Sequence, residues 1–483
     1  MTVSSLTNPP FAHELLIAQL AVQRAALVTK RALAAVNISA RITASPPTLS
    51  PSSSDLEMLA SPFSSTADLT STCSSSISQY LHPNTAPPSP CSPFFPTGPF
   101  PARSSSYHGS YFPSTPATPA AAAAATVARG PRGQGANGGL PRRLSTAKRD
   151  ASPVTVADLA AQALLVAAVR AAFPGDAVLG EEDASALRAD PELAARVWEL
   201  VDAARLDDDA SERLLGPRPR DIAEMMALIE LGGAGGTAAA KEAVAAGGRV
   251  WCLDPIDGTS AYMQGGQYAI SLALLEGGRE VVGVLGCPNW RFEEEDPAAG
   301  PWRVRERVVD EDGMGLMLSA VRGQGTTVRP MGPGVLREGR RVDRGRGKPV
   351  DLRELHFVDS EKSPTTLTEK VRELARLTGA SYVGGTNLYS SHMRYAAMAL
   401  GGREFVQLRW PKPEKGPWSI WDHAGSQLIY TESGAGKVTD LYGKPIDFSA
   451  GSKLSNNYGL ITADESIHDQ ILALVDRMRN SDK

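Results

Sequence analysis

Hydrophobic residues recur at helical spacing in two stretches of the N-terminal third of the chain. Residues 11–36 place Leu16, Leu20 and Leu27 on one stripe. Residues 158–173 are dominated by Ala and Leu, which are strong helix formers, and a Pro-Gly pair follows them directly. Both stretches therefore predict helices.

Apolar runs bounded by Gly and polar residues predict strands farther along the chain. They are AVLGEE, RVWCLDPIDGT, YAISLALL, EVVGVLG, LHFVDS, SYVGGT and EFVQLRW. YAISLALL and EVVGVLG are joined by EGGR, which predicts a hairpin. Helical patterns fall at 186–249 (with Gly-rich breaks at 232–236 and 247–248), 364–377, 389–400, 420–432 and 464–479. This alternation indicates a layered α/β unit with some antiparallel pairing.

A long Ser/Pro-rich segment interrupts the pattern. Residues 45–120 carry only four charged residues and little apolar surface, so they cannot offset the entropy of ordering and predict disorder. RRLSTAKRD, with a candidate phosphorylation serine, is best interpreted as a solvated linker. The predicted organisation is an N-terminal helix of the catalytic unit, a disordered insertion, a metal-binding lobe and a C-terminal lobe completing the site: 9–40, 41–147, 148–345 and 346–483.

Composition narrows the function classes. The 483 residues include 49 Lys and Arg against 53 Asp and Glu, with both signs interspersed, which disfavours binding of a nucleic acid polymer. No apolar run is long enough to span a bilayer, and MTVSSLTNPPFAHELL does not read as a secretory signal. We therefore expect a cytoplasmic protein without a membrane partner. The four cysteines lack CxxC spacing, which fits a reducing compartment and predicts no zinc site.

The strongest chemical signal is LDPIDGT, residues 253–259. Asp254 and Asp257 stand on either side of a proline, which fixes one φ angle and removes one donor. With the Ile256 carbonyl and the Thr259 hydroxyl they form an all-oxygen cluster, which suits Mg²⁺. A plain Asp-rich turn is the alternative, but the whole string matches rather than one dipeptide.

Three further carboxylates stand where elements begin or end. Glu181 follows a predicted strand in LGEED, Asp158 has capping-box spacing from Thr155, and Asp422 has it from Ser419. Each alone is ambiguous, because acids at such places are commonly solvated or act as caps. Four elements delivering acids to one point would be very costly unless cations neutralised them. We therefore predict two or three Mg²⁺ ions, which would also bind a phosphate.

Together these motifs resemble the Mg²⁺-dependent, lithium-sensitive phosphatase superfamily that includes inositol monophosphatase. LDPIDGT and WDHAG match superfamily-wide motifs, whereas SPVTVADLAAQ, GCPN and PIDFS are closer to its 3′(2′),5′-bisphosphate nucleotidase branch. The resemblance covers nearly all of the chain outside the Ser/Pro segment. It implies an α/β (α+β) fold, the layered αβαβα sandwich of the inositol monophosphatase and fructose-1,6-bisphosphatase type.

The resemblance also implies roles for single residues. Asp158 matches the catalytic acid, and Thr259 matches the hydroxyl that pairs with it to activate water. The implied metal ligands are Glu181, Asp254, Ile256 (through its carbonyl), Asp257 and Asp422. The implied substrate contacts are Thr259, Lys362, Ser363, Ser391, Arg394 and Arg409.

The implied reaction removes the 3′-phosphate of 3′-phosphoadenosine 5′-phosphate to give AMP and phosphate. The sulfated analogue is a further expected substrate, Li⁺ and Na⁺ are expected inhibitors, and the activity is linked to sulfate assimilation. The expected partner is therefore a small nucleotide, while the insertion is a candidate surface for unidentified proteins.

Two departures from the family's usual motifs fall among the residues expected to contact substrate. Ser260-Ala261-Tyr262 replaces the usual Lys-Gly-Phe, and DSEKSPTT replaces a usual His-Ser-Ser-His run. Arg394 stands where Lys is usual, which keeps the charge but changes the hydrogen-bond geometry. His423 is best interpreted as structural. Two alternatives therefore stay open: an inositol phosphate phosphatase, and a non-catalytic phospho-ligand sensor or scaffold that uses the Ser/Pro insertion.

Overall fold

The computed structural model describes residues 9–44, 145–147, 153–291, 304–345, 347, 349–361, 363–434 and 436–481. Most of the predicted insertion, 41–147, lies outside these residues, and so does Lys362. Among the helices of the described part, none is both long enough and apolar enough to cross a membrane.

The first sheet has seven strands in the order β3-β4-β5-β6-β7-β8-β9. They are β3 (Ala177–Gly180), β4 (Arg249–Asp257), β5 (Ala269–Glu276), β6 (Arg279–Cys287), β7 (Leu316–Val321), β8 (Gly325–Pro330) and β9 (Arg340–Val342). β3 and β4 are parallel, and every other neighbouring pair is antiparallel. The predicted β5–β6 hairpin is confirmed, whereas β7 to β9 had not been predicted.

The second sheet has five strands in the order β11-β10-β12-β14-β13. They are β10 (His356–Asp359), β11 (Thr386–Asn387), β12 (Phe405–Arg409), β13 (Gly436–Thr439) and β14 (Leu460–Asp464). β10 is parallel to β11 and β12, so the carboxyl ends of β10 and β12 meet at one edge. Asp359 and Arg409 are the last residues of these two strands.

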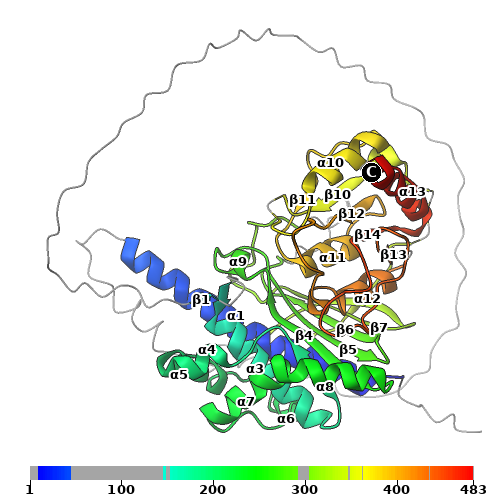
Figure 1. Ribbon diagram of the computed structural model, residues 1–483. Helices are drawn as coiled ribbons and strands as arrows, with labels where there is room; N and C mark the ends of the chain where they lie inside the picture. The colour runs from blue at the N-terminus through cyan, green and yellow to red at the C-terminus, as the bar shows by residue number, and fades with distance from the viewer. Residues whose placement is uncertain are drawn as a thin grey trace, which may run out of the picture. The chain divides into compact units, whose positions relative to one another are not determined.

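Helices enclose and separate the two sheets (Figure 1). One face of the first sheet packs against α1 (Ala12–Ala44) and α3 (Val156–Ala172). Both sheets are contacted by α11 (Ser391–Leu400) and α12 (Ser426–Glu432). The second sheet is covered by α10 (Thr368–Thr378) and α13 (Glu465–Ser481). The connection between β3 and β4 contains α4 (Ser185–Ala189), α5 (Pro191–Asp202), α6 (Asp209–Leu214), α7 (Ile222–Gly232) and α8 (Ala234–Ala245). The predicted αβαβα layering is therefore confirmed.

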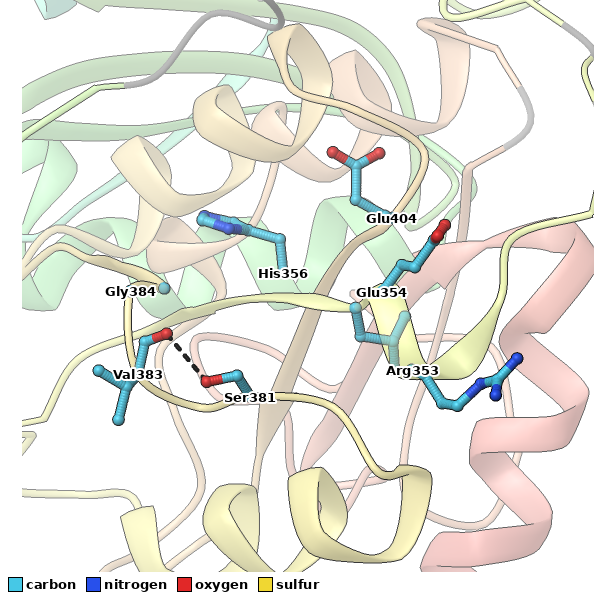
Figure 2. A pocket seen from close by; sticks show the side chains of 9 residues that line it. Arg353, Glu354, His356, Ser381, Val383, Gly384 and Glu404 are labelled. Atoms are coloured by element: carbon cyan, nitrogen blue, oxygen red, sulfur yellow. Dashed lines mark hydrogen bonds between the residues drawn. The ribbon is translucent and has the colours of Figure 1, made fainter. Parts of the chain in front are cut away.

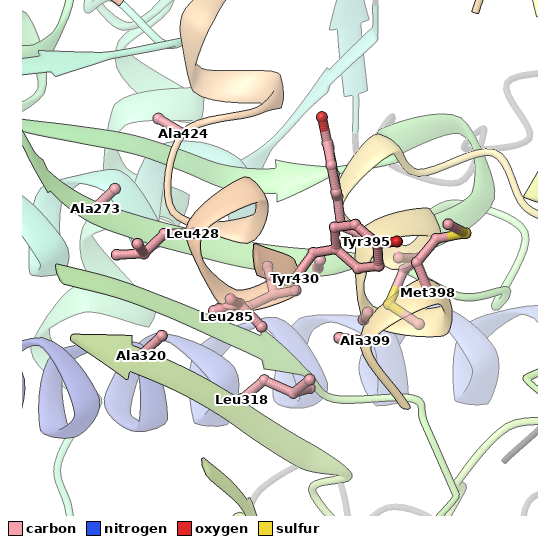
Figure 3. Packing of buried hydrophobic residues seen from close by; sticks show 14 of the residues in the cluster. Ala273, Leu285, Leu318, Ala320, Tyr395, Met398, Ala399, Ala424, Leu428 and Tyr430 are labelled. Atoms are coloured by element: carbon pink, nitrogen blue, oxygen red, sulfur yellow. The ribbon is translucent and has the colours of Figure 1, made fainter. Parts of the chain in front are cut away.

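The apolar core fixes the middle helices against the first sheet (Figure 3). Tyr395 and Met398 of α11 and Leu428 of α12 belong to one buried cluster with side chains of β5, β6 and β7. Because interiors are close-packed, residues at the amino ends of α11 and α12 keep fixed positions relative to this sheet.

Several local predictions need correction. The helix predicted at 420–432 is broken into a 3₁₀ turn, η2 (Ile420–Asp422), and α12. The strand predicted for SYVGGT shrinks to β11, because the chain turns at Gly384, which has a φ of +90°. The linker prediction fails at β1 (Ser145–Ala147), which pairs antiparallel with β2 (Pro153–Thr155).

Two helix boundaries also differ from prediction. α1 continues to Ala44 rather than ending at residue 36, so it enters the segment assigned to the insertion. α8 begins at Ala234, inside the Gly-rich break predicted at 232–236. The division into lobes at 345 and 346 stays a prediction, although the first sheet comes entirely from residues before it and the second from residues after it.

Candidate active site

Asp158 lies in the first turn of α3, where the predicted capping box is present. Its Oδ2 accepts hydrogen bonds from the Thr155 backbone N at 2.9 Å and from the Thr155 hydroxyl at 2.5 Å. Asp158 is 1% exposed. These bonds fix one oxygen of the carboxylate and leave Oδ1 facing Thr259, whose hydroxyl oxygen lies 3.3 Å away.

The paired-Asp turn follows the buried strand β4. Gly258, just beyond the strand, has a φ of +91°, a conformation that L side chains rarely adopt. The turn brings the Thr259 hydroxyl to 3.1 Å from the Ile256 carbonyl oxygen, so its single proton is shared between that oxygen and Asp158. Asp254, 1% exposed, accepts a hydrogen bond from the Ile256 backbone N at 3.2 Å.

Asp257 connects the first sheet to α11. Its Oδ2 accepts hydrogen bonds from the Ser390 hydroxyl at 2.5 Å and from the His392 backbone N at 2.6 Å. Ser390 is the N-cap of α11, and a carboxylate at a helix amino end is stabilised by the free N–H groups there. The two bonds orient one oxygen of Asp257 and tie it to the helix that carries Ser391 and Arg394.

Asp422 completes a trio of carboxylates with Asp254 and Asp257. One oxygen from each lies within 4.8 Å of the others, so the trio could hold a metal ion. Burial, followed by the negative charges of Asp257 and Glu181, raises the pKa of Asp422 to about 7, against the opposing effect of Arg409 and Lys453. Glu181, directly after β3, therefore acts on the same place electrostatically.

The capping box predicted at Ser419 and Asp422 is wrong. Ser419 is the N-cap of η2, but its side chain makes no capping hydrogen bond. Asp422 thus reaches the trio from a 3₁₀ turn before α12, not from a helix head. His423 is fully buried, as a structural histidine should be.

Ser391, Arg394 and Arg409 form a buried cationic group. The Ser391 hydroxyl oxygen accepts hydrogen bonds from Arg394 Nη2 at 3.0 Å and from Arg409 Nη1 at 3.3 Å. Burial, followed by the charge of the nearby Arg409, lowers the pKa of Arg394 to about 10. Two guanidinium groups side by side in a buried place favour an anion between them.

His423 and Trp418 orient Arg409. Burial, followed by the charge of Arg409, lowers the pKa of His423 well below its usual value, so the ring is neutral. Its Nε2 accepts from Arg409 Nη1 at 3.2 Å, which leaves Nδ1 to donate to the Tyr395 hydroxyl at 3.1 Å. The guanidinium carbon lies 4.2 Å from the centre of the Trp418 ring, a cation–π contact.

Ser363 lies in the loop after β10. Its hydroxyl is 3.4 Å from that of Thr365, and its carbonyl accepts from Lys412 at 3.2 Å. No hydrogen bond found in the described part of the chain links it to Arg394 or Arg409. Its contact with substrate, like that of Lys362, stays a prediction.

Sequence reasoning missed two residues that hold the site together. Ser390 bonds Asp257, and the His392 ring joins the Ser426 hydroxyl at 2.7 Å to the Trp421 carbonyl at 2.7 Å. Their position at a predicted helix start, next to a predicted substrate residue, was the available signal.

A pocket of about 270 Å³ elsewhere in the second sheet is not the candidate site. Figure 2 shows that Glu354, His356 and Glu404 line it. These residues precede or begin β10 and β12, whereas Asp359 and Arg409 end the same strands. Ligands of such sheets bind beyond the carboxyl ends of the strands, which is where the acids and arginines gather.

A layered fold with clustered carboxylates beside buried arginines is the arrangement of a phosphate-handling enzyme. The model of the inositol monophosphatase family matches residues 115–479. The chain belongs to this family. A 3′(2′),5′-bisphosphate nucleotidase of Emericella nidulans is 35% identical over 69% of this chain and 90% of its own length.

Other known proteins are similar over a comparable share of the chain. A 3′(2′),5′-bisphosphate nucleotidase of Schizosaccharomyces pombe is 33% identical over 67% of this chain and 84% of its own. A solved Thermotoga maritima IMPase matches with a TM-score of 0.39 and 18% identity, over 68% of this chain and 85% of that one.

Proposed function

We propose that this chain is a Mg²⁺-dependent phosphatase that removes the 3′-phosphate of 3′-phosphoadenosine 5′-phosphate, giving AMP and phosphate. The observation that carries the proposal is the convergence of Asp254, Asp257 and Asp422 beside the buried pair Arg394 and Arg409. The relatives named as bisphosphate nucleotidases support the choice of substrate.

The donor set fits Mg²⁺. Its ligands are carboxylate oxygens, which Mg²⁺ prefers, and the raised pKa of Asp422 reflects the cost of keeping these acids ionised together without a cation. Glu181, Asp254, Asp257, Asp422 and the Ile256 carbonyl would hold two or three ions. When bound, Mg²⁺ stabilises negative charge on the phosphoryl group and lowers the pKa of water.

Asp158 and Thr259 would move the proton. Because Thr155 occupies Oδ2 of Asp158, only Oδ1 is available to accept the Thr259 proton. The Thr259 oxygen is then free to accept a proton from the attacking water, which general-base catalysis requires within hydrogen-bond distance.

Arg394 and Arg409 would bind the phosphate that is not hydrolysed. Ser391 aligns both guanidinium groups, and His423 with Trp418 fixes the plane of Arg409. Planar guanidinium groups bind phosphate oxygens in pairs, so this cationic group favours a bisphosphate over a simple monoester.

The test compares 3′-phosphoadenosine 5′-phosphate, its sulfated analogue and inositol 1-phosphate as substrates for the full chain. Phosphate release is measured with and without Mg²⁺, and then with Li⁺. We expect fastest release from the adenosine bisphosphate, none without Mg²⁺ and inhibition by Li⁺. Faster release from inositol phosphate would refute the substrate assignment, and nucleotide binding without phosphate release would favour a sensor.

A further inference from the structure

The segment that carries Asp422 rests on two strands of the first sheet. The Ser271 hydroxyl of β5 donates to the Ala424 carbonyl at 3.3 Å. On β6, a Cβ built on Gly283 would lie 2.4 Å from the Gly425 carbonyl oxygen, so glycine permits a direct backbone contact. β5 and β6 therefore form the surface that supports the turn of Asp422.

A bulge in the β5–β6 ladder turns Glu280 toward this turn. Leu274 pairs with Val282, whereas Leu275 pairs with Glu280, so one step along β5 matches two along β6. Side chains alternate between the faces of a strand, and an unbroken register would put Glu280 and Gly283 on opposite faces. The extra residue puts them on the same face, as bulges do when they redirect a side chain.

Glu280 caps α12 from outside the helix. Gly425, the N-cap of α12, has no side chain to accept a hydrogen bond from the first turn. Glu280 Oε1 accepts from the backbone N of Gly425 at 2.7 Å and of Leu428 at 3.3 Å, and Oε2 accepts from Gln427 Nε2 at 3.3 Å. The carboxyl group thus fixes the N-cap of α12, Gly425, three residues after Asp422.

Glu280 is 3% exposed, and its burial is only partly compensated. Burial raises the pKa of Glu280, and the bonds to Gly425, Leu428 and Gln427 and the charge of Arg322 only partly offset this, which leaves the pKa at about 7. Burying this carboxylate costs free energy, and the groups that donate hydrogen bonds to it all lie in the first turn of α12 and its N-cap. This arrangement indicates that Glu280 positions the turn rather than only contributing to stability.

We infer that Glu280 is a positioning residue that holds Asp422 against Asp254 and Asp257 and thereby sets the affinity for Mg²⁺. The inference rests on the proposed function. Groups that orient a ligand from behind typically change metal affinity by about 10- to 100-fold when removed. Glu280 is not one of the three clustered carboxylates and bonds the first turn of α12, so its loss should act through that turn.

The experiment compares Glu280→Leu, Glu280→Gln and the control Glu276→Leu, at an exposed glutamate of the same hairpin. Mg²⁺ binding to each full-length protein is measured by calorimetry without substrate. We expect Glu280→Leu to weaken binding about 10- to 100-fold, with KM for nucleotide changed less than about twofold at saturating Mg²⁺. The control should match the wild type.

Glu280→Gln should restore Mg²⁺ affinity to within about threefold, because its amide oxygen still accepts from Gly425 and Leu428 and Gln427 can rotate its amide to pair with it. Equal Mg²⁺ affinity in all variants, with only a lower Tm for Glu280→Leu, would overturn the inference. If Glu280→Leu does not fold, Glu280→Gln decides, since a fall of tenfold or more would contradict the expected rescue. A wild type that binds no Mg²⁺ would instead refute the proposed function.

Discussion

Replacing Thr259 by Ala removes a hydroxyl that lies between Asp158 and the Ile256 carbonyl of the paired-Asp turn. The hydroxyl is 3.3 Å from Asp158 Oδ1 and 3.1 Å from the Ile256 carbonyl oxygen. Asp158 keeps both bonds from Thr155, so the head of α3 should keep its conformation. The change is therefore confined to the proton path.

The expected loss follows from that geometry. Positioned general-base groups contribute about 10²- to 10⁴-fold to the rate. Because the Thr259 proton is shared with Ile256 and its bond to Asp158 is long, we expect the lower part of this range, about 10²- to 10³-fold in kcat. That corresponds to about 2.7–4 kcal/mol of activation free energy.

The assay is kcat for 3′-phosphoadenosine 5′-phosphate at saturating Mg²⁺, with Mg²⁺ binding measured in parallel by calorimetry. Thr259→Ser, which keeps a hydroxyl, is the matched control and should keep most of the activity. The double variant with Asp158→Asn should be scarcely slower than either single one, because residues that act as a unit are not additive. A Thr259→Ala enzyme with more than about a tenth of wild-type kcat would refute this assignment.

Three further predictions concern pH, substrate choice and packing. Since burial raises the pKa of Asp422 to about 7, protons compete with Mg²⁺ below that pH. Calorimetry should show the apparent affinity for Mg²⁺ falling by up to about tenfold per pH unit as the pH drops. An affinity that does not change with pH would contradict this prediction. Arg409→Lys should raise KM for the adenosine bisphosphate about 10- to 100-fold but leave KM for 3′-AMP nearly unchanged. Equal effects on both substrates would argue against binding of the second phosphate by Arg409. Gly283→Ala should lower the free energy of unfolding in urea by about 1–3 kcal/mol, whereas Gly175→Ala, with open space around it, should not.

Residues close together in sequence were the predictable part of the site. The strand of LDPIDGT, the turn after it and the capping box of Thr155 with Asp158 all depend on neighbours within a few positions. Local spacing failed at Asp422, where the same Ser-x-x-Asp spacing predicted a helix head and the chain instead forms a 3₁₀ turn. The conformation of the Asp422 turn depends on contacts with β5 and β6, which are distant in sequence.

Features set by register lay beyond sequence reasoning. The orientation of Glu280 depends on a bulge in the ladder with β5, and no run of residues around it indicates one. The bonds of Ser390 and His392 to Asp257 join residues more than a hundred positions apart. The αβαβα layering was predictable because alternating strands and helices admit few ways of burying their apolar faces.

The attachment of Asp257 to the amino end of α11 has a thermodynamic consequence. One carboxylate oxygen of Asp257 is hydrogen-bonded to the amino end of α11, the helix that carries Ser391 and Arg394. Any shift of Asp257 on cation binding is therefore transmitted to these two residues of the cationic group. Thermodynamic linkage is reciprocal: the factor by which the bound cation changes the affinity for the nucleotide equals the factor by which the bound nucleotide changes the affinity for the cation. On the proposed function, the affinity for the cation and the affinity for the nucleotide are therefore coupled rather than independent.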